Sequence, residues 1–150
     1  MSKPAVIVDL DGTLAQFDPI VVHDWVLTEN KHWDKFFEYM ENAPIISDIF
    51  RLVCILKESG QQILICSGRP ETHRAESLDW LIANNVPHDA IYLRPDNSDH
   101  LLDEDVKRAL FEKIQSDGFA PWLVLDDRSS VVAEWRKLGM TCLQCAPGDF

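Results

Sequence analysis

Two aspartates that directly follow an apolar stretch are the residues of this chain best suited to chemistry. Residues 6–8 are apolar and β-branched, as in a buried parallel strand, and Asp9 and Asp11 come immediately after them. Ligands of open α/β sheets bind at the carboxyl ends of strands, so this position favours a functional site. Strand alternation directs both carboxylates the same way and turns Leu10 inward. One carboxylate can attack phosphorus, and a second can move protons.

Gly12 and Thr13 complete the pattern after the two aspartates. Glycine allows a turn without a clash at Cβ, and Thr13 offers a hydroxyl and an amide to an anion. An Asp-Gly turn at the end of a strand also occurs without any function. The functional interpretation therefore depends on the whole Asp-x-Asp-Gly-Thr sequence after an apolar strand.

The segment 6–14 resembles the first motif of the haloacid dehalogenase (HAD) superfamily of phosphatases, whose members carry three further motifs in a fixed order. Residues 62–66 form another apolar run, which leads into Ser67, Gly68 and Arg69. This segment looks like the second motif with its phosphate-binding serine.

The other two motifs follow in the same order. Residues 103–107 open a helical pattern and resemble the third motif, with Lys107 as its lysine. Residues 122–125 run into Asp126 and Asp127, which look like the acidic fourth motif. The four matches together span most of the chain.

The resemblance implies a role for each acidic residue. Asp9 would attack phosphorus and carry an aspartyl-phosphate, while Asp11 would protonate the leaving oxygen and then deprotonate water. An unperturbed pKa near 3.9 keeps Asp9 ionised, so a cation must offset the repulsion between it and the phosphoryl oxygens. Mg²⁺, which prefers oxygen ligands, would be held by Asp9, the backbone carbonyl of Asp11, and a carboxylate of Asp126 or Asp127. The sequence does not distinguish the last two.

The resemblance also implies a substrate-binding set around the transferring phosphoryl group. Ser67 and Lys107 would bind that group, with Lys107 as a positive point charge. Arg69 would clamp the phosphate or a neighbouring carboxylate. Asp103 would cap its helix and hold Lys107, four residues further on, on the same face. Besides Lys107, the substrate-binding set comprises Thr13, Ser67, Gly68, Arg69 and Asp103.

Within the superfamily, the chain looks most like the 3′-phosphatase domain of phage polynucleotide kinase and its small standalone relatives. The likeness covers residues 4–150 apart from one insert, and the matching segments are residues 67–69, 103–107, 126–128, 132–139 and 148–150. It implies removal of a 3′-phosphate from a nucleic-acid end or a nucleotide.

Two arginines of those phosphatases have no counterpart at the matching positions. Residues 15–20, which match the arginine-containing loop of the relatives, have no basic side chain. The first basic residue that could replace that arginine is Lys31. Leu101 stands two residues before Asp103, where the relatives tend to have arginine. Both missing charges would serve substrate phosphates.

Alternating strands and helices must position these residues. The pattern predicts an α/β fold: a HAD-type, Rossmann-like, doubly wound parallel sheet with a small helical cap insert after the first strand. Expected later strands are residues 62–66, 90–93, 122–125 and 141–144, and expected helices are residues 44–59, 70–84, 103–116 and 129–138. The whole chain, residues 1–150, is expected to form a single domain.

Residues 17–42 form the expected cap insert, which is rich in aromatic residues. These aromatics could pack over the site, exclude water and stack on a base or sugar. They could equally fill a small helical subcore. The insert is too short for a large cap domain, so we expect a fairly open cleft. The aromatic residues are Trp25, Trp33, Phe36, Phe37 and Tyr39.

Composition and charge exclude some functions. The net charge is −11 over 150 residues, which opposes strong nonspecific binding to duplex nucleic acid. No apolar stretch is long enough to span a bilayer, and no signal peptide fits the N-terminus, so we expect a cytoplasmic protein.

The cysteines and histidines give no indication of a second site. Cys142 and Cys145 have the spacing of a zinc or redox pair, but an expected strand would direct their thiols to opposite sides. Together with Cys54 and Cys66 they are interpreted as reduced core residues. The histidines show no ligand spacing and are interpreted as surface or structural residues: His23, His32, His73, His88 and His100.

The leading hypothesis is a Mg²⁺-dependent phosphomonoesterase acting on nucleotide or polynucleotide ends. The alternative is a 5′-nucleotidase or a small-metabolite phosphatase with the same machinery. A binding or regulatory protein that kept only the fold is disfavoured, because it would not need the charge cluster of Asp9, Asp11, Ser67 and Lys107. No Gly-x-x-x-x-Gly-Lys-Ser/Thr loop is present, so the chain carries no kinase half.

Overall fold

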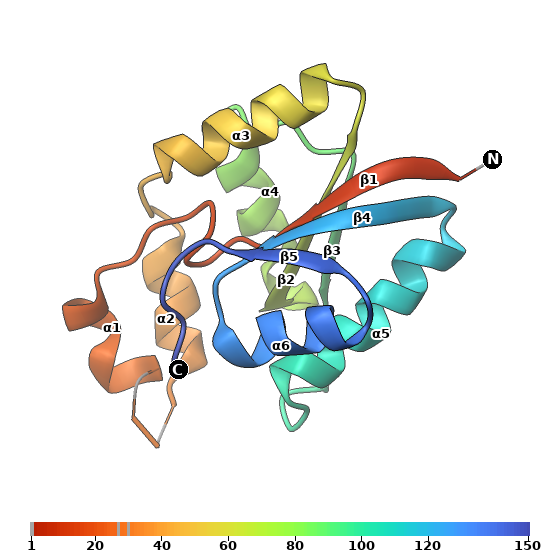
Figure 1. Cartoon of the computed structure of the whole chain (residues 1–150). Coiled ribbons are helices and arrows are strands. Elements are labelled where there is room, and N and C mark those ends of the chain that lie inside the picture. The colour runs from red at the N-terminus through yellow and green to blue at the C-terminus, as the bar shows by residue number, and fades with distance from the viewer. Residues whose placement is uncertain (1, 27, 30) are drawn as a thin grey trace.

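A five-stranded parallel sheet forms the framework of the molecule (Figure 1). The structure is a computed structural model that describes residues 2–26, 28–29 and 31–150. The strand order is β3-β2-β1-β4-β5, which places β1 at the centre. The strands are β1 (Lys3–Val8), β2 (Gln62–Pro70), β3 (Ala90–Arg94), β4 (Phe119–Asp126) and β5 (Thr141–Gln144). This arrangement confirms the expected doubly wound parallel sheet.

Helices cover both faces of the sheet, and each face has its own apolar core (Figure 1). On one face, Val6 and Val8 of β1 pack with α3 (Ser47–Glu58) and α4 (Arg74–Ala83). On the other face, Ile7 packs with α5 (Asp103–Ser116) and α6 (Ser129–Lys137). The alternation of β1 therefore continues into Leu10, which is fully buried in the first core, as expected.

The insert after β1 contains two short helices, α1 (Pro19–Val26) and α2 (Trp33–Met40). In Figure 1 they lie together beside the carboxyl end of the sheet, close to the C-terminal segment. The insert is helical, as its sequence predicts. Many of its apolar side chains join the core between the sheet and helices α3 and α4.

Two helices begin later than expected. Residues 44–46 lie outside α3, because Ile45 bridges to Ala15 and the amide of Ile46 donates to the carbonyl of Leu14. This segment is thus tied to the loop after β1. Pro70 does not begin a helix but ends β2 opposite Arg94, and a single turn of 3₁₀ helix (Glu71–His73) precedes α4. By contrast, α5 and β5 have the expected bounds.

The cysteines are free, and the two at the end of the chain diverge. Cys142 is buried in β5 within the core over α5 and α6. Cys145 lies just beyond β5 and packs against the opposite core. Of the helices in the described part of the chain, none is both long and apolar enough to cross a membrane.

Candidate active site

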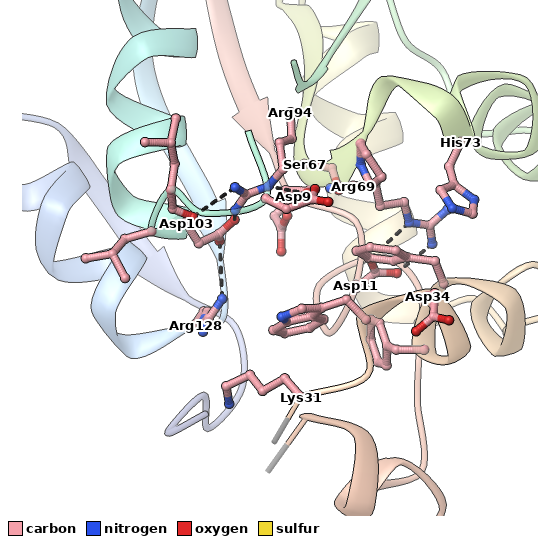
Figure 2. A pocket seen from close by; sticks show the side chains of 18 of the residues that line it. Asp9, Asp11, Lys31, Asp34, Ser67, Arg69, His73, Arg94, Asp103 and Arg128 are labelled. Atoms are coloured by element: carbon pink, nitrogen blue, oxygen red, sulfur yellow. Dashed lines mark hydrogen bonds and ion pairs between the residues drawn. The ribbon is translucent and has the colours of Figure 1, made fainter. Parts of the chain in front are cut away.

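The carboxyl ends of three adjacent strands meet at one end of the sheet and form the floor of a cleft. Val8 of β1 pairs with Ile65 of β2 and with Leu125 of β4, so the residues that follow these positions become neighbours. The cleft has a volume of about 950 Å³. Its lining includes Asp9, Asp11, Ser67, Arg69, Asp103, Asp126 and Asp127, several of which point toward one another in Figure 2.

Three carboxylates and one ammonium group gather at the floor of this cleft. Asp9, Asp126 and Asp127 are buried, and each offers one oxygen within 4.8 Å of the others. The Nζ atom of Lys107, from α5, donates to Asp126 Oδ2 at 2.9 Å and to Asp9 Oδ1 at 3.2 Å. Lys107 is itself 1% exposed. The fold thus brings together the predicted nucleophile Asp9, the lysine of the third motif and the two aspartates of the fourth motif.

Burial changes the ionisation of this cluster. Burial, followed by the charge of Asp126, raises the pKa of Asp9 well above its ordinary value, although Lys107 opposes the shift. An ordinary pKa is assumed for Asp9 from the sequence, because the sequence does not show how deeply this carboxylate is buried. Burial and Asp126 also raise the pKa of Asp127 to about 7. Three carboxylates beside one lysine therefore need further positive charge.

The two aspartates of the fourth motif have different surroundings. Asp126 is saturated: Oδ1 accepts hydrogen bonds from the amides of Asp127 and Arg128, and Oδ2 accepts from Lys107 and Trp135 Nε1. Asp127 Oδ1 accepts a hydrogen bond from Thr13 Oγ1 at 3.3 Å. Its Oδ2 is buried and has no hydrogen-bond partner within the described residues. A buried carboxylate oxygen without a donor fits a cation ligand.

The turn at Gly12 leaves room for this carboxylate. Gly12 has a φ of +86°, and a Cβ atom there would collide with the carboxylate of Asp127. Thr13 uses both groups that its sequence context offers to an anion. Its hydroxyl holds Asp127, whereas its amide donates to the carbonyl of Leu10 within the turn. Thr13 thus orients a carboxylate of the protein itself.

Asp11 and Arg69 form the second charged pair of the cleft. Arg69 Nη2 and Nε donate to the two oxygens of Asp11 at 2.5 and 2.9 Å, a bidentate arrangement (Figure 2). Arg69 is 2% exposed, and its Nη1 donates to Ser77 of α4. Of the two roles open for Arg69, the structure therefore shows the clamp on a carboxylate. The amide of Arg69 also donates to Ser67 Oγ, which fixes that hydroxyl beside the cleft.

The expectation that Asp103 caps its helix and holds Lys107 is wrong. Leu102 is the N-cap, and no side chain caps α5. Asp103 pairs instead with Arg94 Nη2 at 3.3 Å and with Arg128 Nη1 at 3.7 Å (Figure 2). A Cβ at position 68 would collide with Asp103, so Gly68 allows the close approach of β2 to this carboxylate. Lys107 is held by Asp9 and Asp126.

The aromatic residues of the insert divide between two roles. Trp33, Phe36 and Phe37 border the cleft and also contact one another, with ring centroids 5.7 to 6.0 Å apart. Trp25 and Tyr39 pack on each other at 5.8 Å and contribute to the core. Packing beside the site and filling a subcore are thus both present, and Trp33, Phe36 and Phe37 do both.

Several cleft residues were not identified from the sequence. Arg94 ends β3, and its guanidinium group donates to the carbonyls of Gly68, Ser98 and Leu101. Arg128 directly follows the fourth motif. The sequence shows an arginine at this position but not that its side chain borders the cleft. His73 borders the cleft with its ring against Phe37. An arginine at the carboxyl end of a strand was a usable signal for Arg94, since that is where sheet ligands bind.

This sheet and this acidic floor define a HAD-type phosphatase. Residues 3–150 match the family model of the polynucleotide kinase PNKP phosphatase domain, and the chain belongs to that family.

Solved structures agree with this assignment. The chain resembles Pnkp1 in a Pnkp1/Rnl/Hen1 complex with a TM-score of 0.82 and 26% identity, over 99% of this chain and 48% of that chain. A second structure, of the Pnkp1/Rnl/Hen1 RNA repair complex, gives 0.81 and 25%, over 99% and 44%. This chain thus spans about half the length of those matched chains. The class C acid phosphatase from Bacillus anthracis shares the fold, with a TM-score of 0.67 and 17% identity, over 99% and 67%.

Proposed function

We propose that this chain is a Mg²⁺-dependent phosphomonoesterase that acts through an aspartyl-phosphate on Asp9. Its proposed substrate carries a 3′-phosphate at the end of a nucleic acid or on a nucleotide. The observation that carries this proposal is the buried cluster of Asp9, Asp126 and Asp127 with Lys107 at the floor of the cleft. The family match and the likeness to Pnkp1 support the class of substrate.

The residues present fit a hard dication. Carboxylate oxygens are the donors that Mg²⁺ prefers, and Asp127 Oδ2 is buried without a donor in the described part of the chain. We propose Asp9, the backbone carbonyl of Asp11 and Asp127 as the ligands, with Asp126 positioning Lys107 and the amide of Asp127. When bound, Mg²⁺ would neutralise the carboxylates and the phosphoryl oxygens, which keeps Asp9 ionised.

Asp9 begins the proposed reaction. One of its carboxylate oxygens attacks phosphorus, a phosphorus–oxygen bond to Asp9 forms, and the bond to the substrate oxygen breaks. Asp11 supplies the proton that the leaving oxygen needs. Lys107 and the Ser67 hydroxyl bind the transferring oxygens. Both oxygens of Asp11 accept hydrogen bonds from Arg69 in the structure, so the proposed proton transfer requires one of these two bonds to break.

Water completes the cycle. Asp11, now deprotonated, removes a proton from a water molecule that attacks phosphorus. Inorganic phosphate leaves, and both Asp9 and the protonated Asp11 are restored.

Position of the phosphate distinguishes the proposal from its alternative, a 5′-nucleotidase or small-metabolite phosphatase. The assay compares release of phosphate from one oligonucleotide phosphorylated at its 3′ or its 5′ end, with the two mononucleotides as further substrates. We expect the 3′-phosphorylated oligonucleotide to have the higher kcat/KM. Faster hydrolysis of the 5′-mononucleotide would contradict the 3′ assignment while leaving the aspartyl-phosphate chemistry in place.

A further inference from the structure

Most cations of the cleft are already engaged by groups of the protein. Eight of the described lining residues are aspartates, and four are lysine or arginine. Arg69 is bound to Asp11, and Arg94 donates to three carbonyls and to Asp103. Of the four lysine and arginine residues in the described lining, this leaves Lys31 and Arg128 as those that can still bind an anion.

Arg128 is only partly used. Its Nε donates to the carbonyl of Phe150 at 2.7 Å, whereas Nη1 is 3.7 Å from Asp103 Oδ2, beyond hydrogen-bond distance. Within the described residues, neither terminal nitrogen of Arg128 donates a hydrogen bond. Its side chain is 20% exposed, so these nitrogens can reach a ligand in the cleft.

Lys31 lies close to the same place, on the cap side of the cleft (Figure 2). Its Nζ is 5.8 Å from the ring centroid of Trp33, and the guanidinium carbon of Arg128 is 5.5 Å from the same centroid. Lys31 donates to the carbonyl of Val26, and no carboxylate in the described part of the chain pairs with it. The indole ring of Trp33 therefore contacts two cations: Lys31 of the insert and Arg128 of the segment between β4 and α6.

The two cations repel each other. Burial, and then the positive charge of Arg128, lowers the pKa of Lys31. An anion bound between them would remove this repulsion and use the free donors of Arg128. Elsewhere in the described lining, carboxylates outnumber cations, so this position is the favourable one for a second negative group.

We propose that Lys31, Trp33 and Arg128 form a second anion subsite, which binds the phosphate on the 5′ side of the nucleotide whose 3′-phosphate lies at Asp9. The proposal rests on the proposed 3′-phosphatase function. The ligand is a phosphate group separated by one nucleoside from the scissile phosphate, either an internucleotide diester or a terminal monoester. This pair replaces the charges that the sequence lacks near residues 15–20 and 101.

Binding to the Asp9→Asn variant tests the subsite without turnover. Calorimetric titrations in Mg²⁺ compare deoxythymidine 3′-phosphate, deoxythymidine 3′,5′-bisphosphate and a dinucleotide with a 3′-phosphate. We expect the second phosphate to tighten binding about ten- to hundredfold, as for charge-assisted hydrogen bonds. The bisphosphate and the dinucleotide separate a monoester ligand from a diester.

The same titrations on further variants assign the gain to residues. Lys31→Gln and Arg128→Gln should each reduce the ratio of the two dissociation constants by about threefold or more, and Trp33→Leu should also reduce it. Arg51→Gln removes the same charge from an exposed site on α3 and should leave the ratio unchanged. Thermal unfolding checks that each variant is folded. Lys31→Gln changes a residue remote in sequence from the metal ligands, so it remains informative if Arg128→Gln is unstable.

Three results would overturn the subsite: no gain from the second phosphate, a gain that survives both substitutions, or an equal loss in Arg51→Gln. Failure of the proposed function has a different signature. In that case the wild-type enzyme would hydrolyse the 5′-mononucleotide faster than the 3′-phosphorylated oligonucleotide, whatever ratio of dissociation constants is measured in Asp9→Asn.

Discussion

Asp9 has no obvious replacement among the residues of the cleft floor. Both oxygens of Asp126 already accept two hydrogen bonds each, which hold this carboxylate in place at the cleft floor. Asp127 is held by Thr13, and its Oδ2, which has no hydrogen-bond partner among the described residues, is suited to a cation. Each carboxylate of the cluster thus has a different set of contacts, which under the proposed mechanism suits Asp126 to positioning and leaves Asp9 and Asp127 for the reaction and the metal.

Replacement of Asp9 by asparagine should abolish hydrolysis of an aryl phosphate and leave the fold intact. The substitution removes the attacking oxygen charge without a change in volume, and Lys107 keeps its contact with Asp126. Steady-state assays and thermal unfolding measure the two effects. Wild-type rates in this variant would exclude Asp9 as the nucleophile.

Replacement of Lys107 by alanine should lower kcat/KM by about a hundredfold or more, because a buried positive charge beside the phosphoryl group is lost. Burial alone would lower the pKa of Lys107, but Asp126 and Asp9 outweigh it and raise the pKa, so Lys107 stays charged. Lys113→Ala, an exposed position in the last turn of the same helix, is the matched control and should retain activity. Equal losses in both variants would point to helix stability as the cause.

At the scale of elements, a single carboxylate joins α3 to two strands. Asp89, just before β3, accepts hydrogen bonds from Lys57 Nζ at 2.7 and 2.8 Å and from the amide of Ile63 at 2.8 Å. Burial alone would raise the pKa of Asp89, but these hydrogen bonds outweigh it and lower the pKa.

The Asp89→Asn variant should lose about 1–2 kcal/mol of unfolding free energy at pH 7. Because the pKa is lower in the folded state, this contribution is complete above the unfolded value of about 4 and disappears as pH falls through the folded value. Denaturant unfolding of both proteins between pH 7 and pH 3 measures it. Asp79→Asn, an exposed site on α4, should change stability by less than about 0.5 kcal/mol. A deficit that stays constant down to pH 3 would contradict the hydrogen-bonded carboxylate.

Element bounds were predictable where local signals and tertiary contacts agree. The helix from Asp103 has three acids in its first turn and a regular apolar face, and its bounds match the sequence pattern. The helix expected from Pro70 failed because pairing with β3 extends β2 through that proline. The partners of Asp103 were not predictable, since Arg94 and Arg128 reach it from two other segments.

For the whole molecule, the buried acidic cluster links metal binding to stability. Three buried carboxylates lie close together and Lys107 pairs with two of them, so a dication that binds the folded state should stabilise it. We expect Mg²⁺ at about 100 times its dissociation constant to raise the unfolding free energy by about 2.7 kcal/mol. The Asp127→Asn variant should lose most of this gain. Removal of Mg²⁺ should also stop hydrolysis, and a metal-free protein with full activity would contradict the assigned site.

Net charge acts on the same scale and limits how nucleic acid can bind. With a net charge of −11, the surface as a whole repels a phosphodiester backbone. If the proposed substrate is correct, recognition of a nucleic-acid end must therefore depend on the few cations that border the cleft. The cap insert contributes one of these cations, Lys31, and so takes part in the site as well as in the core.

The most direct measurement is reductive trapping of the intermediate on Asp9. Borohydride reduces an acyl phosphate to an alcohol, so quenching the enzyme during turnover with Mg²⁺ and substrate should convert residue 9 to homoserine, detected by peptide mass spectrometry. No homoserine should form without substrate or in Asp9→Asn. Homoserine at another aspartate, or unmodified Asp9 under conditions of rapid turnover, would contradict covalent catalysis at this residue.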